Sequence, residues 1–111
     1  MSLTAKTCTP CQGGVEPLSR ETAAGMLEQV PGWELDEAGR EISRRFRFRN
    51  FVEAVAFVNR VADVAEAEDH HPDIVLGYGY AEIRVHTHKI GGLHENDFIL
   101  AAKVNDLYVR E

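Results

Sequence analysis

Apolar and polar residues recur along the chain with two distinct periods. Apolar residues three and four positions apart predict three helices, at about residues 19–30, 51–69 and 95–109. Alternation at every second residue predicts four strands, at residues 33–36, 41–49, 74–76 and 80–87. The predicted order of elements is therefore α-β-β-α-β-β-α.

Capping residues and helix breakers stand where these elements should begin and end. Ser19 is a favourable N-cap for the first helix. Asn50, with Glu53 three residues later, forms a capping-box pattern for the second helix, which Pro72 ends. The second helix, at residues 51–69, is the longest and clearest of the three.

The connections between consecutive strands are short, which favours antiparallel pairing, because a parallel crossover needs a dozen or more residues. Only the helix at 51–69 is long enough to serve as such a crossover. We therefore expect an α+β fold, in which a four-stranded antiparallel sheet has helices packed on one face. Residues 1–17 lack apolar periodicity and are expected to form a flexible N-terminal arm, whereas residues 18–111 form a single domain.

One predicted strand has a basic face. Ile42 and Phe46 lie on one side of it, whereas Arg45 and Arg47 lie on the other. The whole chain, however, has 18 acidic against 12 basic residues and a net charge of −6. This balance opposes binding to a phosphate backbone. We therefore expect a solvated sheet face and no nucleic-acid partner.

The length of 111 residues argues for one domain with one core. No apolar run approaches the ~20 residues of a membrane-spanning helix, so no membrane partner is expected. The first residues contain no apolar signal segment, which predicts a cytoplasmic protein.

The two cysteines, Cys8 and Cys11, form a Cys-x-x-Cys pair in the polar N-terminal stretch. A zinc ribbon needs two such pairs, and a thioredoxin-like motif follows a strand and opens a helix. Since neither condition is met, we expect reduced thiols without an essential role. A metal ion or a disulfide shared between subunits is the alternative.

All five histidines lie between residues 70 and 94, at the ends of predicted elements. His70 and His71 follow the second helix, His86 and His88 end the fourth strand, and His94 precedes the last helix. An imidazole, with an ordinary pKa of ~6.5, can donate or accept a proton at neutral pH, which indicates acid–base catalysis. The partial negative charge at the helix C-terminus favours the protonated form of His70 or His71.

Metal binding is the alternative chemistry for these histidines. His86 and His88 share a strand face and could chelate an ion, with His70, His71 or His94 completing the shell. The histidines lack helical spacings such as His-Glu-x-x-His, and no carboxylate is placed obviously between them. Proton transfer is therefore the preferred interpretation, and no metal ligands are assigned.

The histidines and several neighbouring residues, in their types and in their spacing along the chain, resemble the signature of the pterin-4a-carbinolamine dehydratase family. That signature contains a charged residue, then His-His-Pro, an aromatic residue, a histidine and an aspartate. The residues of this chain that fill these places, each at a fitting separation, are Glu66, His70, His71, Pro72, Tyr78, His88 and Asp97. The resemblance covers roughly residues 8–105.

The resemblance implies a hydro-lyase that converts 4a-hydroxytetrahydropterin to quinonoid dihydropterin. Such an enzyme recycles the cofactor of aromatic amino-acid hydroxylases, which implies a link to phenylalanine hydroxylase. It implies no cofactor, because the pterin is itself the substrate.

By the same resemblance, His70 and His88 are the acid–base candidates, and His71 binds and orients the substrate. Asp97 would orient a histidine or hold the last helix. The residues left with a supporting or substrate-binding role are Glu66, Pro72 and Tyr78.

The resemblance also implies a homodimer joined at sheet edges or a homotetramer joined through helices. Animal members help a homeodomain transcription factor to dimerise, so a non-catalytic pterin-binding or dimerisation module is the alternative function. Many members have Thr or Ser at the place of His94, which here either caps the last helix more weakly or enters the pocket. We expect His86 to be solvent-exposed and Trp33 to lie in the core.

Overall fold

The computed structural model describes residues 3–8 and 15–108 and contains one four-stranded sheet. Its strand order is β1-β2-β4-β3, and every neighbouring pair is antiparallel. The strands are β1 (Glu34–Leu35), β2 (Ile42–Arg47), β3 (Asp73–Gly77) and β4 (Tyr80–Val85). The helices are α1 (Arg20–Met26), α2 (Phe51–Glu68) and α3 (Glu95–Leu107), with short 3-10 turns η1 (Leu3–Ala5), η2 (Leu27–Gln29) and η3 (His88–Ile90). The predicted α+β class and the order of elements are confirmed.

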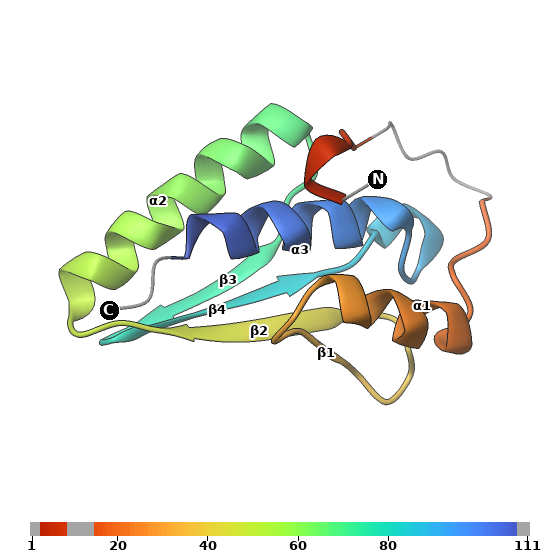
Figure 1. Ribbon diagram of the computed structural model, residues 1–111, viewed down its shortest axis with the longest axis horizontal. Coiled ribbons are helices and arrows are strands. Elements are labelled where there is room, and N and C mark those ends of the chain that lie inside the picture. The colour runs from red at the N-terminus through yellow and green to blue at the C-terminus, as the bar shows by residue number, and fades with distance from the viewer. Residues whose placement is uncertain (1–2, 9–14, 109–111) are drawn as a thin grey trace.

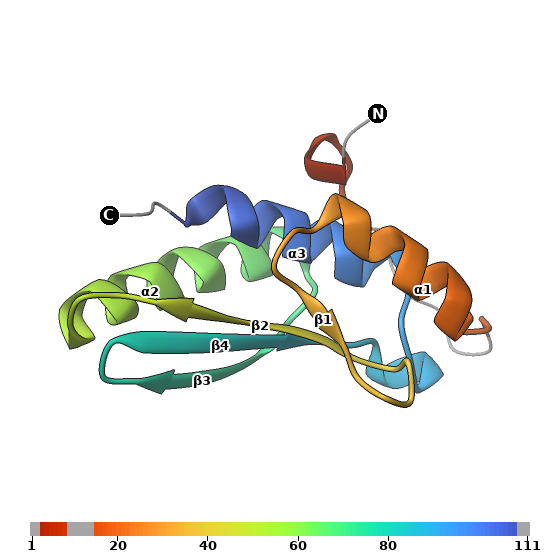
Figure 2. The same ribbon diagram turned by 60° about the horizontal axis from the view of Figure 1, so that its bottom comes forward.

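Helices α2 and α3 lie next to each other on one face of the sheet (Figures 1 and 2). This follows from the alternation along β2 and β4, because every second residue of a strand points to the same face. The inward residues of these strands and the apolar residues of the helices form one core, which includes Ile42, Phe46, Phe57, Val61, Ala81, Ile83, Val85, Phe98 and Leu100. On the opposite face, Arg45 and Arg47 are exposed, as expected for a solvated surface.

Several element boundaries differ from the prediction. The first predicted helix divides into α1, capped by the Ser19 side chain, and the tighter turn η2. Strand β2 stops at Arg47, because Asn50 already caps α2 by accepting a hydrogen bond from the Glu53 N–H. Strand β4 stops at Val85 rather than residue 87, because Thr87 leaves the ladder and pairs with Gly92.

Arg44 lies on the helix-facing side of β2, in line with Ile42 and Phe46. Its guanidinium lies 4.4 Å from the centre of the Phe46 ring and donates to Asn105 Oδ1 at 2.8 Å. The same oxygen accepts the indole N–H of Trp33 at 2.7 Å. Trp33 is only 5% exposed, which confirms the prediction that it belongs to the core.

Residues 3–8 pack against the helices. Leu3 is buried, Lys6 forms an ion pair with Glu95 at 2.6 Å, and the Cys8 N–H donates to Glu68 Oε1 at 2.7 Å. The Cys8 thiol is free, and Cys11 lies outside the described residues. The boundary between an arm at 1–17 and a domain at 18–111 stays a prediction.

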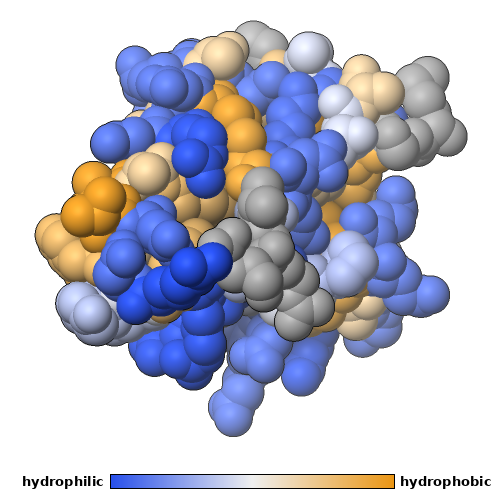
Figure 3. Space-filling view, turned by 60° about the vertical axis from the view of Figure 1, so that its left-hand side comes forward, coloured by the Kyte–Doolittle hydropathy of each residue, from blue (hydrophilic) through white to orange (hydrophobic). Residues whose placement is uncertain are grey.

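The end of the molecule where α2 begins exposes apolar side chains. Figure 3 views this end and shows apolar surface between hydrophilic residues. Phe51 and Val52, in the first turn of α2, are 47% and 75% exposed. The outermost strand, β3, also exposes Val75 and Leu76. Within residues 3–8 and 15–108, every helix is too short or too polar to cross a membrane.

Candidate active site

Asp97, in the first turn of α3, is completely buried and accepts three hydrogen bonds. Its Oδ2 atom accepts the Thr87 hydroxyl at 2.8 Å and the His94 backbone N–H at 2.9 Å. Its Oδ1 atom lies 2.6 Å from His70 Nε2. A buried carboxylate needs such partners to offset the loss of hydration. Asp97 therefore ties the end of α2, the segment after β4 and the start of α3 to one point.

The chain turns at the end of α2 so that the His70 side chain reaches the Asp97 carboxylate. Asp69 adopts the left-handed conformation (φ 53°), and the His70 N–H bonds back to the Ala65 carbonyl at 3.1 Å. This is the pattern with which many helices end, and it turns the chain sharply. Pro72 follows and cannot continue the helix. The His70 side chain is only 12% exposed.

The segment after β4 carries the second pair of histidines. Val85 and Thr87 point into the core, so His86 and His88 lie on the other side of the chain. His86 Nε2 lies 3.1 Å from His88 Nδ1, and the ring centres are 4.0 Å apart. His88 is exposed, whereas His86 is only 21% exposed because it lies between His88 and Glu41. The expectation that His86 is solvent-exposed is therefore wrong.

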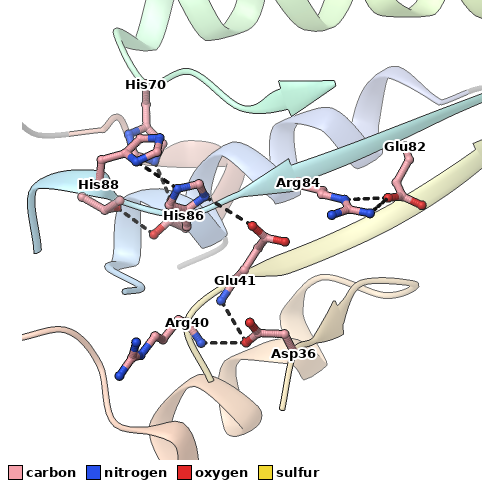
Figure 4. Close-up of polar contacts among 10 residues, drawn as sticks. Asp36, Arg40, Glu41, His70, Glu82, Arg84, His86 and His88 are labelled. Carbon is pink, nitrogen blue, oxygen red and sulfur yellow. Dashed lines mark hydrogen bonds and ion pairs between the residues drawn. The ribbon is translucent and has the colours of Figure 1, made fainter. Parts of the chain in front are cut away.

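The two acid–base candidates are linked through one carboxylate. Thr87, which precedes His88, shares the Asp97 carboxylate with His70. Figure 4 shows that His70 extends from the segment after α2 and His88 from the segment after β4. The mostly buried His70 and the exposed His88 thus lie at the same end of the β3–β4 hairpin, one before β3 and one after β4.

His71 follows His70 in sequence, but its side chain contacts a different residue. Its Nε2 atom lies 2.5 Å from Oε2 of Glu66, in the last turn of α2. Both side chains are largely exposed, at 56% for His71 and 76% for Glu66. Pro72 is half-buried between this surface pair and the start of β3. His71 and Glu66 therefore form a solvent-exposed pair at the end of α2, next to His70 in sequence.

Tyr78 does not join the histidines within one chain. It lies in the β3–β4 turn and is 75% exposed. The histidines lie at the opposite end of that hairpin (Figure 1). Because β3 has five residues, the two ends are about 16 Å apart at ~3.3 Å per residue.

His94 caps α3. Its Nδ1 atom accepts the Asn96 N–H at 3.0 Å. In return, Asp97 Oδ2 accepts the His94 backbone N–H, which completes a capping box. Of the two alternatives for His94, the structure supports the cap.

The Cys8 thiol lies 3.6 Å from the carbonyl oxygen of Asn96, the residue before Asp97. Burial, together with the neighbouring Glu68 carboxylate, raises the pKa of this thiol to about 12. Hydrogen bonds from the Lys103 ammonium and the Cys8 N–H lower the pKa of the Glu68 carboxyl. At neutral pH the thiol is therefore protonated and is a poor nucleophile.

Thr87 is the site residue that sequence analysis assigned no role. One signal was present, because Thr87 stands in register with Ala81, Ile83 and Val85 on the apolar side of the strand. A hydroxyl at such a position needs a buried partner, and Asp97 provides it.

The sequence matches a known family over most of its length. Residues 16–107 match the family described as pterin 4 alpha carbinolamine dehydratase. The chain belongs to this family. A relative from Halorhodospira halophila, named "Putative pterin-4-alpha-carbinolamine dehydratase", is 71% identical over 96% of this chain and 98% of its own. A relative of the same name from Methylococcus capsulatus is 58% identical over 96% of this chain and 93% of its own.

Two solved structures resemble the fold. A transcriptional coactivator/pterin dehydratase from Brucella melitensis superposes with a TM-score of 0.78 at 29% identity, over 83% of this chain and 98% of its own. A pterin dehydratase-like protein identified as a RuBisCO assembly factor in the alpha-carboxysome gives a TM-score of 0.59 at 25% identity, over 68% of this chain and 88% of its own. Proteins with this fold are thus associated with more than one role.

Proposed function

We propose that the protein removes water from 4a-hydroxytetrahydropterin and releases quinonoid dihydropterin. Membership of the dehydratase family supports the substrate class. The observation that carries the proposal is the pair of His70 and Asp97, to which Thr87, the residue before His88, also bonds. We infer that these two imidazoles, carried by segments that share one carboxylate, serve the two proton transfers of the reaction.

The reaction breaks one bond to oxygen and one bond to hydrogen. The C4a hydroxyl leaves as water after it receives a proton, and nitrogen N5 loses its proton as the C4a–N5 double bond forms. A protonated imidazole assists the first step, and a neutral imidazole assists the second. The protein takes one proton from N5 and gives one proton to the hydroxyl. The number of protons bound to the protein is therefore unchanged after each turnover.

His70 is suited to accept the N5 proton. The ionised Asp97 carboxylate only accepts hydrogen bonds, so the ring proton of a neutral His70 lies on Nε2 and leaves the Nδ1 lone pair available. When Nδ1 takes a proton, the Asp97 carboxylate, whose Oδ1 lies 2.6 Å from Nε2, offsets the charge of the imidazolium. Asp97 is therefore a positioning residue for His70, as the acidic member of a catalytic triad is for its histidine.

His88 is suited to donate the proton to the leaving oxygen. Its Nδ1 atom is occupied by the contact with His86 Nε2, 3.1 Å away. Its Nε2 proton then remains for the substrate, and its exposure allows a proton to be regained from solvent. His71 would contact and orient the pterin from the exposed edge of the site, held there by Glu66.

The remaining expectations concern the setting of this reaction. We propose that the pterin comes from an aromatic amino-acid hydroxylase such as phenylalanine hydroxylase, in the cytoplasm, and that turnover needs no added cofactor.

We also propose a homodimer or homotetramer. The exposed apolar residues of edge strand β3 support this, because an unpaired strand edge is a template for pairing with a second copy. Light scattering during size-exclusion chromatography tests the assembly, and a monomer would contradict it.

A stopped-flow assay tests the proposed activity. Carbinolamine is generated freshly, and its loss is followed by absorbance with and without the full chain, before and after treatment with a chelator. We expect a rate proportional to protein concentration and insensitive to the chelator. A rate equal to the spontaneous loss would contradict the dehydratase function, and loss of activity with the chelator would contradict the metal-free mechanism.

A further inference from the structure

A second cluster of polar side chains lies beside His86, outside the His70–Asp97 pair. Glu41, Asp73 and His86 each place one ligand atom within 4.8 Å of the other two. They come from the residue before β2, the first residue of β3 and the residue after β4. These three strands are neighbours in the sheet, so residues distant in sequence meet at one sheet end.

The strand register explains the meeting. Ile42 pairs with Val85 and both are buried, so the residues just beyond them, Glu41 and His86, point to the face without helices. A turn fixes Glu41, because Asp36 Oδ1 accepts the backbone N–H groups of Arg40 and Glu41 at 2.8 and 3.1 Å (Figure 4). The cluster is thus built on strand ends.

His86 offers a nitrogen that has no hydrogen-bond partner. Its Nδ1 atom is shielded from solvent and is the buried side-chain atom without a partner among residues 3–8 and 15–108. Glu41 Oε2 lies 3.5 Å away, beyond the usual range for an N–H···O bond. Two ligands at ~2.0–2.1 Å from one tetrahedral ion lie about 3.3 Å apart, which is close to the observed separation.

The other ring nitrogen of His86 has a partner, Nδ1 of His88 at 3.1 Å. Metal-binding histidines commonly use the second nitrogen in this way, because the contact fixes the ring orientation. The neighbouring cation, the Arg84 guanidinium, donates to Glu82 at 2.6 Å, as Figure 4 shows, and its charge also attracts the Glu41 and Asp73 carboxylates. Glu41 and His86 are left facing each other.

We propose that Glu41, Asp73 and His86 bind one divalent transition-metal ion of the Zn²⁺ type. One imidazole nitrogen and two carboxylate oxygens are ligands that Zn²⁺ accepts, and a fourth position would hold water. Mg²⁺ and Ca²⁺ are disfavoured, because they prefer shells made of oxygen alone. This site does not depend on the proposed dehydratase activity.

Isothermal titration of the full chain with Zn²⁺ tests the site. All proteins carry Cys8→Ser and Cys11→Ser, which removes the thiols as competing ligands. We expect binding of one ion per chain, weakened about tenfold or more by Glu41→Gln or by Asp73→Asn. Asp63→Asn, at an exposed position of α2, removes the same charge elsewhere and should leave the affinity unchanged.

A second measurement uses protein in which the three proposed metal ligands are unchanged. Paramagnetic Co²⁺ added to the same background protein should broaden or shift the His86 ring resonances at one equivalent. Absence of Zn²⁺ binding, equal affinities in the cluster variants and Asp63→Asn, or Co²⁺ effects that spare His86 would each overturn the proposal. None of these outcomes bears on the dehydratase assay, in which the same rate is expected before and after treatment with a chelator.

Discussion

The buried Asp97 carboxylate lies 2.6 Å from His70 Nε2, although 27 residues separate the two in sequence. The pair joins the first turn of α3 to the residue that follows α2 and its cap. It leaves His70 Nδ1 as the nitrogen available for a proton. The orientation of one imidazole is thus set by a residue that need not touch the substrate.

Asp97→Asn should lower kcat by roughly 10²-fold or more, because the amide removes the charge that stabilises the His70 imidazolium. KM should change little, since Asp97 is completely buried. Steady-state kinetics across pH separates this role from a structural one, because a purely structural loss would lower the amount of folded enzyme without altering the pH profile. An unchanged kcat in the folded variant would contradict the assignment.

Thr87→Val should lower the free energy of unfolding by about 1–3 kcal/mol, because Asp97 Oδ2 loses the hydroxyl donor 2.8 Å away in a buried site. Denaturant titration measures this loss. Thr87→Ser is the matched control, since it keeps the hydroxyl and should retain more of the stability. Equal stability of the valine and wild-type proteins would show that the Asp97 carboxylate does not need this bond.

His71→Ala should raise KM and leave kcat nearly unchanged. The side chain is 56% exposed and contacts Glu66 rather than the His70–Asp97 pair, so its role is to hold the pterin. Initial rates over a range of carbinolamine concentrations separate the two constants. A lowered kcat at constant KM would instead make His71 a participant in proton transfer.

Glu68→Gln should reduce the sensitivity of stability to acid. Lys103 and the Cys8 N–H lower the pKa of Glu68 in the folded state, so its ionised form stabilises the protein above the ordinary carboxyl pKa. This stabilisation is lost as the pH falls through the lowered pKa. Thermal unfolding from pH 7 to pH 3 should show a smaller loss in Glu68→Gln than in wild type, and parallel curves would contradict the shift.

Much of the fold was predictable from local patterns. Helix α2 and its Asn50 cap follow from apolar spacing and one side chain. Arg44 was harder, because period-two alternation places it among buried residues while its charge predicts exposure. Its position depends on Asn105 and the Phe46 ring, which come close only in the folded chain.

The candidate site was predictable as a set of residues but not as an arrangement. The sequence could indicate that His70, His88 and Asp97 act together. It could not separate Tyr78 from them, because that separation depends on the direction of the β3–β4 hairpin. Nor could it find the approach of Glu41 and Asp73 to His86, which depends on the order of strands in the sheet.

The central claim is that His88 transfers a proton to the departing hydroxyl, and the rate of carbinolamine dehydration in His88→Ala tests it most directly. We expect the stopped-flow rate to fall about 10²–10⁴-fold, with an unchanged circular dichroism spectrum. His94→Ser, which replaces another histidine but keeps a capping oxygen for α3, should turn over at nearly the wild-type rate. Wild-type turnover in His88→Ala would contradict the account.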